Sequence, residues 1–504
     1  MTFPILSLIV FIPMVAAVIM LLIPAERRNE TRAVALAAAT FDLLLSAWVY
    51  VQYLVNQMTG YQFIETYRWL PQLGISLKFG VDGMSAPLVL LTGIVMFTGV
   101  LISWGVDDKH HPAGIQDRPR EFFAFLFILA SGVFGVFASL DLFMLFFFYE
   151  IAVFPMYLLI AIWGWVKTRE YAAMKLTLYL FIGSVISLVG ALAMYWAAYQ
   201  STGVLSFDML LLEKANFPVN FQVAWFLPVF FGFAVLGGIF PFHNWSPDGH
   251  VAAPTAVSMF HAGVLMKLGA FAALRVGIML LPEGAKYWSW LVMACAGIAV
   301  VYGAFIAFQQ TDMKYMIGFS SVSHMGLVML GLSTLNKTGL TGAGVQMFSH
   351  GVMTALFFAV TGMIYDRSHT RQIPELGGMN KIMPFASVGF IIGGLVSMGM
   401  PGFSGFIAEF PIFMGVWYVN SLLAIVASIS IILTAAYIMR NIRDVFFRPM
   451  PENLEGHITD VTVLDKIAIV TLCTFMIGIG LFPSVMVPMV QTGVENILRL
   501  LGGA

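Results

Sequence analysis

Long apolar stretches dominate the sequence and constrain its fold more than any other feature. Fourteen stretches follow one another along the chain, each long enough for a helix to cross a bilayer core about 30 Å thick. Only 10% of the 504 residues are charged and 60% are apolar, whereas about 25% are charged in an average soluble chain. The sequence therefore predicts an all-α, polytopic membrane protein with about fourteen transmembrane helices.

Two of these stretches contain helix-breaking residues. The stretch 383–419 is too long for one straight helix and has Pro401 inside it, and the segment 237–250 combines glycines, prolines and histidines. Irregular backbone at membrane depth is tolerated only where it lines protein or water, and paired broken helices are typical of transporters built from inverted repeats. The fourteen predicted spans are 3–24, 33–53, 84–105, 121–139, 141–164, 174–198, 222–243, 254–281, 288–309, 314–334, 341–364, 383–419, 421–440 and 465–487.

Composition excludes several classes of function. The 25 Lys and Arg residues nearly balance the 26 Asp and Glu residues, so the chain has no basic field to attract nucleic acid. Cys295 and Cys473 lie far apart in apolar runs, which excludes a disulfide framework and a thiolate-held metal or iron–sulfur centre. The sequence has no dinucleotide fingerprint and no phosphate-binding loop. We expect no redox chemistry on this chain.

The distribution of basic residues predicts the orientation. Loops after odd-numbered spans hold seventeen Lys and Arg residues, Lys109, Lys167 and Arg371 among them, whereas loops after even-numbered spans hold five. Because basic loops stay on the cytoplasmic side, we expect the odd-numbered loops in the cytoplasm and both termini on the opposite side. This bias suits a bacterial inner membrane.

Three ionisable residues fall where lipid or buried helix is expected. Glu150 lies in a phenylalanine-rich run five residues before Pro155, Lys267 lies deep in the eighth span, and Glu409 follows the break at Pro401. A charge at mid-bilayer costs about 2.5–3.5 kcal/mol on insertion scales, so such residues are functional by default. We interpret all three as proton-transfer residues; the alternative is a set of structural hydrogen bonds and ion pairs.

Four histidines are candidates for a proton relay. His243, His261, His324 and His350 lie in or beside predicted spans, and histidine titrates near neutral pH. A single one would more often be a satisfied core residue, but several in one chain with buried Glu and Lys favour a relay. In a regular helix His261 and Lys267 are about 240° apart, so they do not share a face.

Several motifs together resemble one family. The chain resembles, over nearly its whole length, the antiporter-like, proton-pumping membrane subunits of respiratory complex I, and within that family the M-type chain of bacterial NADH–quinone oxidoreductase. The L-type chain carries a long lateral helix for which this sequence has no room. The segments that carry the resemblance are 80–85, 141–164, 241–254, 262–267, 311–314, 320–326 and 401–410.

This resemblance implies a fold and an organisation. Two inverted five-helix repeats, spans 4–8 and 9–13, would each contain one broken helix and shape half of a proton route. The implied units are residues 1–120 with helices 1–3, residues 121–281 with the first repeat, residues 282–440 with the second repeat, and residues 441–504 with helix 14 and the tail.

The resemblance also implies site residues, cofactors and partners. Glu150, Lys267 and Glu409 would transfer protons, with His324 and His350 on the central axis. No cofactor or metal is expected on this chain; FMN, iron–sulfur clusters and quinone are expected on partner subunits. The expected partners are lipid, the antiporter-like L and N chains as neighbours and, indirectly, the peripheral redox arm, with no nucleic acid.

One position departs from the family pattern. The family usually places a lysine seven residues before the position of His243, where it pairs with the glutamate of span five. That position here is Leu236. Either another group replaces the lysine, with His243 and His261 as candidates, or this channel handles protons differently.

Three alternatives to a proton-translocating subunit of NADH–quinone oxidoreductase remain open on the sequence. The first is a chain of a multisubunit sodium/proton antiporter, which would work without an NADH-linked partner. The second is a membrane subunit of a hydrogenase or another ferredoxin-linked complex. A purely structural scaffold is disfavoured, because a scaffold has no need for several charges at mid-bilayer.

Overall fold

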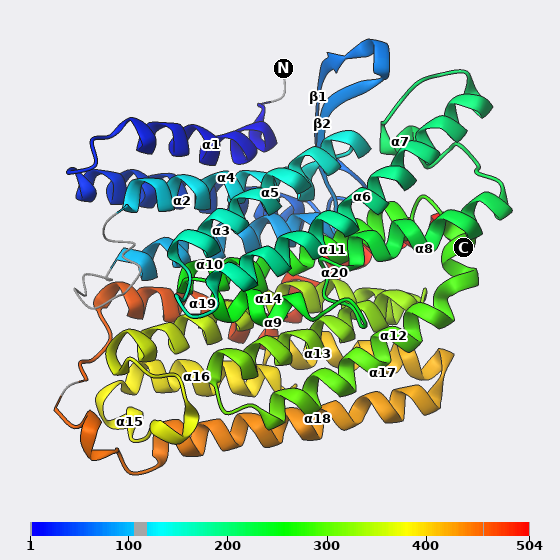
Figure 1. The fold of residues 1–504 in the computed structure, drawn as a ribbon. Helices are drawn as coiled ribbons and strands as arrows, with labels where there is room; N and C mark the ends of the chain where they lie inside the picture. The colour runs from blue at the N-terminus through cyan, green and yellow to red at the C-terminus, as the bar shows by residue number, and fades with distance from the viewer. Residues whose placement is uncertain (1–2, 105–117, 457, 503–504) are drawn as a thin grey trace.

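The computed structural model describes residues 3–104, 118–456 and 458–502, and these are almost entirely helical (Figure 1). Lys109, one of the basic residues used for the orientation, lies outside the described residues. Twelve helices in the described chain are long and apolar enough to cross a membrane. Each of them coincides with a predicted span, so the prediction of an all-α, multi-pass membrane protein is confirmed.

Eleven long helices, each corresponding to one predicted span, form most of the bundle. They are α1 (Ile5–Leu22), α2 (Arg28–Val55), α3 (Ser85–Trp104), α4 (Pro119–Ala138), α5 (Leu142–Trp163), α6 (Arg169–Thr202), α12 (Pro282–Gln309), α13 (Met313–Ser333), α14 (Lys337–Ser368), α18 (Ser421–Asn441) and α19 (Val463–Leu481).

The eighth span is one continuous helical run with two π-helical turns. It consists of α10 (Thr255–Phe260), the π-turn η2 (His261–Leu265), α11 (Met266–Ala272) and the π-turn η3 (Ala273–Ile278). The run is buried throughout, and π-turns inside helices are frequent at functional sites. The angle of about 240° expected between His261 and Lys267 assumed a regular α-helix, so it does not hold across η2.

The two stretches with helix breakers are divided, as expected. The seventh span consists of α8 (Val219–Ala234), an irregular segment and α9 (Trp245–Ala252). The twelfth consists of α16 (Pro384–Ser397) and α17 (Ser404–Val419), with Gly399 and Gly402 at positive φ between them. Glycine adopts this conformation without a side-chain clash. The total of fourteen crossings and the inverted relation of the repeats stay predictions.

Some elements were not predicted. Residues 54–83, between the second and third predicted spans, contain an antiparallel hairpin of β1 (Gln62–Leu70) and β2 (Ile75–Val81). The last predicted span ends at Leu481 rather than 487, and an amphipathic helix, α20 (Val487–Leu500), follows it. The remaining short elements are η1 (Pro71–Leu73), α7 (Met209–Leu212), η4 (Ile373–Glu375), α15 (Met379–Ile382), the π-turn η5 (Ile442–Phe447), η6 (Glu452–Leu454) and η7 (Pro483–Val485).

The same capping arrangement occurs at two spans. Asp141 caps the N-terminus of α5 and Asp312 that of α13, each accepting hydrogen bonds from two backbone N–H groups of the first turn. Asp141 also forms an isolated β-bridge with Asp208, and Asp312 forms one with Gln372. Both bridges join the start of a helix to the loop after the next span.

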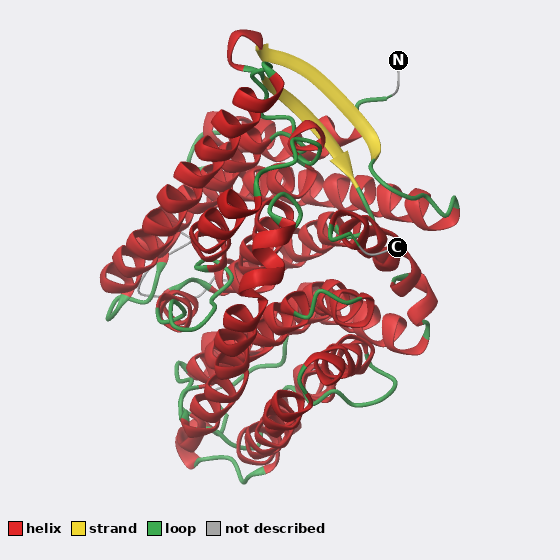
Figure 2. Ribbon diagram, turned by 90° about the vertical axis from the view of Figure 1, so that its right-hand side faces the viewer, coloured by secondary structure: helices red, strands yellow, loops and turns green. Residues whose placement is uncertain are grey.

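The centre of the bundle and its two ends are distinct. α3, α13, α14 and the eighth span are almost wholly buried, whereas α2, α6 and α18 expose apolar side chains at the periphery. α15 lies at one end of the molecule and α7 with the C-terminus at the other (Figure 1). Figure 2 views this second end, with the hairpin across the helix ends. We call the end formed by β1, β2, α7 and α20 the hairpin face.

Candidate functional site

The break after α8 places two aromatic side chains in the centre of the bundle. The indole Nε1 of Trp245 donates a hydrogen bond of 2.9 Å to the carbonyl of Val235, which holds α9 against the end of α8. The imidazole of His261 stacks on Trp245 with 5.2 Å between ring centroids. Both side chains are fully buried. The broken helix is therefore a packed part of the core and brings α9 beside the π-turn of the eighth span.

Two buried histidines meet at this point. The rings of His250 and His261 lie 4.3 Å apart between centroids, edge to face. Nε2 of His250 is 2.9 Å from the hydroxyl of Ser246. Nδ1 of His250 and both ring nitrogens of His261 are buried and have no hydrogen-bond partner in the described protein. Most buried polar atoms have a partner, so these nitrogens are candidates for proton exchange.

Lys267 lies near four buried histidines. Its side chain is fully buried, and its ammonium group donates a hydrogen bond to the carbonyl of Ala262, in the turn before it. No carboxylate forms an ion pair with Lys267 among the described residues. The lysine lies within electrostatic range of the buried histidines, which are His250, His261, His324 and His350. A charge on Lys267 therefore acts on each of them.

Two further buried histidines, which interact electrostatically with Lys267, extend this group into a line. The rings of His324 and His350 stack with 5.3 Å between centroids and 10° between planes. Nε2 of His350 lies 3.1 Å from the hydroxyl of Ser321. His324 comes from α13 and His350 from α14. The two central helices thus bring their histidines together.

The line ends at Glu409, in α17, just beyond the break between α16 and α17. Its Oε1 lies 3.4 Å from Nε2 of His324 and accepts a 3.1 Å hydrogen bond from Gln346. The side chain is almost fully buried. Nδ1 of His324 is 2.8 Å from the carbonyl of Ser320, whose hydroxyl lies 2.8 Å from that of Tyr437. Glu409 and His324 are therefore held in contact by groups from four helices.

Glu150 and His243 are separate from this line. Glu150, on α5, is half-buried; it meets the hydroxyl of Ser184, and its Oε1 has no hydrogen-bond partner. His243 packs against Phe240 and Tyr302. No hydrogen bond or ion pair joins Glu150 to His243 or His261 in the described chain. Neither histidine therefore contacts Glu150 in place of the lysine that the family usually has at position 236.

Several members of the line were not predicted from the sequence. His250 lies in the segment 237–250 and follows His243 by seven positions, but it was not among the proposed relay residues. The polar partners Ser246, Ser321, Gln346 and Tyr437 carry no signal in a single sequence, because only the packing of distant helices brings them to the histidines.

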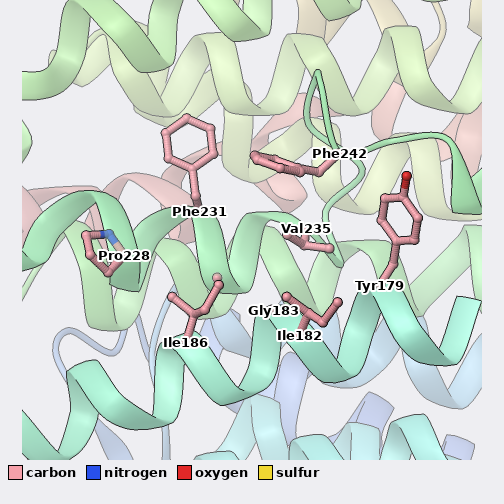
Figure 3. A pocket seen from close by; sticks show the side chains of 9 residues that line it. Tyr179, Ile182, Gly183, Ile186, Pro228, Phe231, Val235 and Phe242 are labelled. Carbon is pink, nitrogen blue, oxygen red and sulfur yellow. The ribbon is translucent and has the colours of Figure 1, made fainter.

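The groove beside the first broken helix is apolar and offers no second site for proton transfer. This groove of about 390 Å³ between α6 and α8 is lined by apolar side chains, with Tyr179 as its one ionisable residue (Figure 3). Within the described ranges, no group of three or more His, Cys, Asp or Glu residues is arranged to hold a metal ion. The buried line from His250 to Glu409 is the candidate site.

Comparisons with known proteins show the family to which this chain belongs. Residues 139–434 match the family model described as NADH:quinone oxidoreductase/Mrp antiporter, TM. The chain is 36% identical over 490 residues to "NAD(P)H-quinone oxidoreductase chain 4" of Synechococcus sp., covering 95% of this chain and 90% of that protein. This chain belongs to the NADH:quinone oxidoreductase/Mrp antiporter family. The match spans both broken helices and every residue of the line.

Solved structures of this family share the fold. One chain of respiratory complex I from Thermus thermophilus matches with a TM-score of 0.88 and 26% identity, over 99% of this chain and 100% of that one. One chain of the Mrp complex from Dietzia sp. matches with a TM-score of 0.85 and 19% identity, over 100% of both chains. The second likeness shows the fold alone.

Proposed function

We propose that this chain is a proton-translocating membrane subunit of an NADH–quinone oxidoreductase, of the M type. The observation that carries the proposal is the buried line His250, His261, Lys267, His350 and His324, which ends at Glu409. The family supports the proposal, because it includes a NAD(P)H-quinone oxidoreductase chain that is 36% identical to this chain. The residues of the line determine how protons would move through the chain.

Repulsion between protons can move charge along the line. Two positive charges on neighbouring groups repel strongly in a medium of low dielectric constant. A proton that arrives at His250 or His261 therefore disfavours the proton on Lys267. The proton displaced from Lys267 passes to His350 and His324, and Glu409 accepts it at the end of the line. Quinone reduction in partner subunits would trigger each cycle.

The residue types favour protons over sodium. Lys267 and the four histidines of the line present nitrogen atoms, which bind protons, whereas hard metal cations prefer oxygen ligands. A protonated lysine in the middle of the route also repels a sodium ion. We therefore propose proton translocation rather than the sodium/proton exchange of the antiporter alternative.

Partners and orientation belong to the same proposal. L- and N-type chains would be the membrane neighbours, and the peripheral partners would carry FMN, iron–sulfur clusters and quinone. The hairpin face, with both termini, would lie on the non-cytoplasmic side of a bacterial inner membrane. The two spans capped by Asp141 and Asp312 would be equivalent helices of inverted repeats, because their capping arrangements match.

Purification of the native complex through a tag on this chain tests the proposal. The complex is extracted in mild detergent, its subunits are identified by mass spectrometry, and NADH–quinone activity is measured. Flavin and iron–sulfur subunits that co-purify with activity support the proposal. A set of small membrane chains without redox centres, with sodium-dependent transport, would instead identify an antiporter subunit.

A further inference from the structure

A second buried charge cluster lies at the hairpin face. It consists of Asp82, which caps α3, Tyr61, which precedes β1, Glu213, which follows α7, and Arg275 in the π-turn η3. Asp82 and Arg275 are almost fully buried, whereas Tyr61 and Glu213 are partly exposed. The cluster therefore extends from the protein interior to the surface of the hairpin face.

Its members are joined in one continuous chain of contacts. The guanidinium of Arg275 forms a 2.5 Å ion pair with Oδ1 of Asp82 and donates a 3.0 Å hydrogen bond to the hydroxyl of Tyr61. That hydroxyl donates a 3.3 Å hydrogen bond to Oε1 of Glu213. Charge-assisted contacts of this kind are strong and geometrically specific. Tyr61 thus connects the buried ion pair to a carboxyl that reaches the surface.

The positive and negative charges are unequal in number within the four residues of the cluster. One guanidinium serves two carboxyl groups, and the ion pair with Asp82 already engages it. The charged groups around Glu213 are Arg275, Asp82, Arg499 of α20 and the adjacent Lys214, and none forms an ion pair with it in the described chain. Burial raises the pKa of Glu213. Oδ2 of Asp82 is also buried without a partner. A proton is the simplest compensating charge.

The position of the cluster relates it to the central line. Arg275 and Lys267 are the two charged residues of the eighth span, and eight residues of helix separate them by about 12 Å. The ring of Phe271 lies between them, 4.9 Å from the guanidinium, and packs edge to face on Phe137. The cluster is thus the next charged group toward the hairpin face along the Lys267 helix.

We propose that Glu213, Tyr61, Arg275 and Asp82 form a proton-release group at the hairpin face. The inference rests on the proposed function. The carboxylate of Glu213 accepts protons that the central line discharges toward the hairpin face, and it then releases them into the medium there. Arg275 and Asp82 are positioning residues, which hold Tyr61 and thereby the Glu213 carboxyl.

The test uses the complete complex in vesicles whose pH is set separately on each side. We expect Glu213→Gln to lower proton pumping per NADH oxidised about tenfold and to abolish its dependence on the pH at the hairpin face. Glu213→Asp should restore part of both. Glu283→Gln is the matched control, because Glu283 is also a glutamate, lies in the first turn of α12 and pairs with Lys286 at the surface.

Lys267→Met separates failure of this inference from failure of the proposed function. If Lys267→Met stops pumping but Glu213→Gln leaves both the pumping ratio and its pH profile unchanged, the release group is wrong and the proposed function stands. If Lys267→Met leaves pumping intact, the proposed function itself is wrong. If Glu213→Gln loses pumping but keeps the wild-type pH profile, the role of Glu213 is merely structural. That result would also overturn the release group.

Discussion

The carboxyl of Glu409 lies 3.4 Å from Nε2 of His324, in the interior of the helix bundle. Glu409 belongs to α17, immediately after the broken segment, and His324 to the middle of α13. The contact therefore joins a discontinuous helix to a continuous one. It also defines the end of the buried line, because Glu409 is the last ionisable residue in contact with the histidines.

Replacement of Glu409 by glutamine should stop proton transfer at this contact. Glutamine keeps the size of the side chain but has no carboxylate to accept a proton from His324. We expect pumping to fall by about 10²–10⁴, the usual contribution of a positioned acid or base. Pumping is measured with a pH-sensitive dye in vesicles. Glu495→Gln, at an exposed pair with Lys337, is the control, and equal pumping in both variants would contradict the assignment.

His250 and His243 form a matched pair for a second test. They lie in the same broken segment, but only His250 contacts another histidine of the line. His250→Asn should reduce pumping at least about tenfold, whereas His243→Asn should change it by less than about twofold. The measurement is the number of protons pumped per NADH oxidised by each of the two variants. A larger loss in the His243 variant would show that protons enter by another way.

The site of the missing lysine predicts a double-mutant cycle. Leu236 is fully buried, so an unpaired lysine there should destabilise the protein by about 2.5–3.5 kcal/mol. If Glu150 is within reach, the cost of Leu236→Lys should be smaller with Glu150 present than with Glu150→Gln. The free energy of unfolding of all four variants in detergent gives the coupling. A coupling of zero would mean that the two positions do not meet in this chain.

Asp141 should make stability depend on pH. Burial raises the pKa of this carboxyl, at the hairpin-face end of α5, to about 6 from a usual value of 3.8. The folded protein then holds a proton that the unfolded chain has released, so stability falls as the pH rises from 3.8 to 6. The loss is at most about 3 kcal/mol, since one pKa unit is worth about 1.4 kcal/mol.

Asp141→Asn tests this linkage, because asparagine is also a good N-cap and does not titrate in this range. Thermal unfolding of the wild type should occur at progressively lower temperature between pH 4 and pH 6, relative to the variant. Parallel pH profiles for the two proteins would show that the native carboxyl has its ordinary pKa.

The features that depend on a single helix could be predicted from the sequence. The lengths of the apolar runs were enough to identify the spans, and Pro401 with the glycines beside it was enough to identify a broken helix. Buried charges such as Lys267 and Glu409 were evident because they interrupt apolar runs. These signals are local, and the structure placed both residues in the buried line.

Contacts between distant segments could not be predicted in this way. Gln346 and Glu409 are 63 positions apart, and Ser320 and Tyr437 are 117 apart, so nothing in a single sequence pairs them. The hairpin was missed because its strands alternate weakly between buried and exposed residues, and because its register depends on contacts with the start of α5 and the loop before α7. Glu150 was predicted as part of the relay, but its contacts are with α6 rather than with the histidines.

The most direct test of the central claim is proton pumping by the complex that carries Lys267→Met. Methionine fills a similar volume but cannot hold a proton, so the line from His250 to Glu409 would be interrupted at its centre. Pumping and NADH oxidation are measured together in the same vesicles. We predict loss of pumping with the complex still assembled, whereas pumping at the wild-type ratio would show that protons do not cross this chain through Lys267.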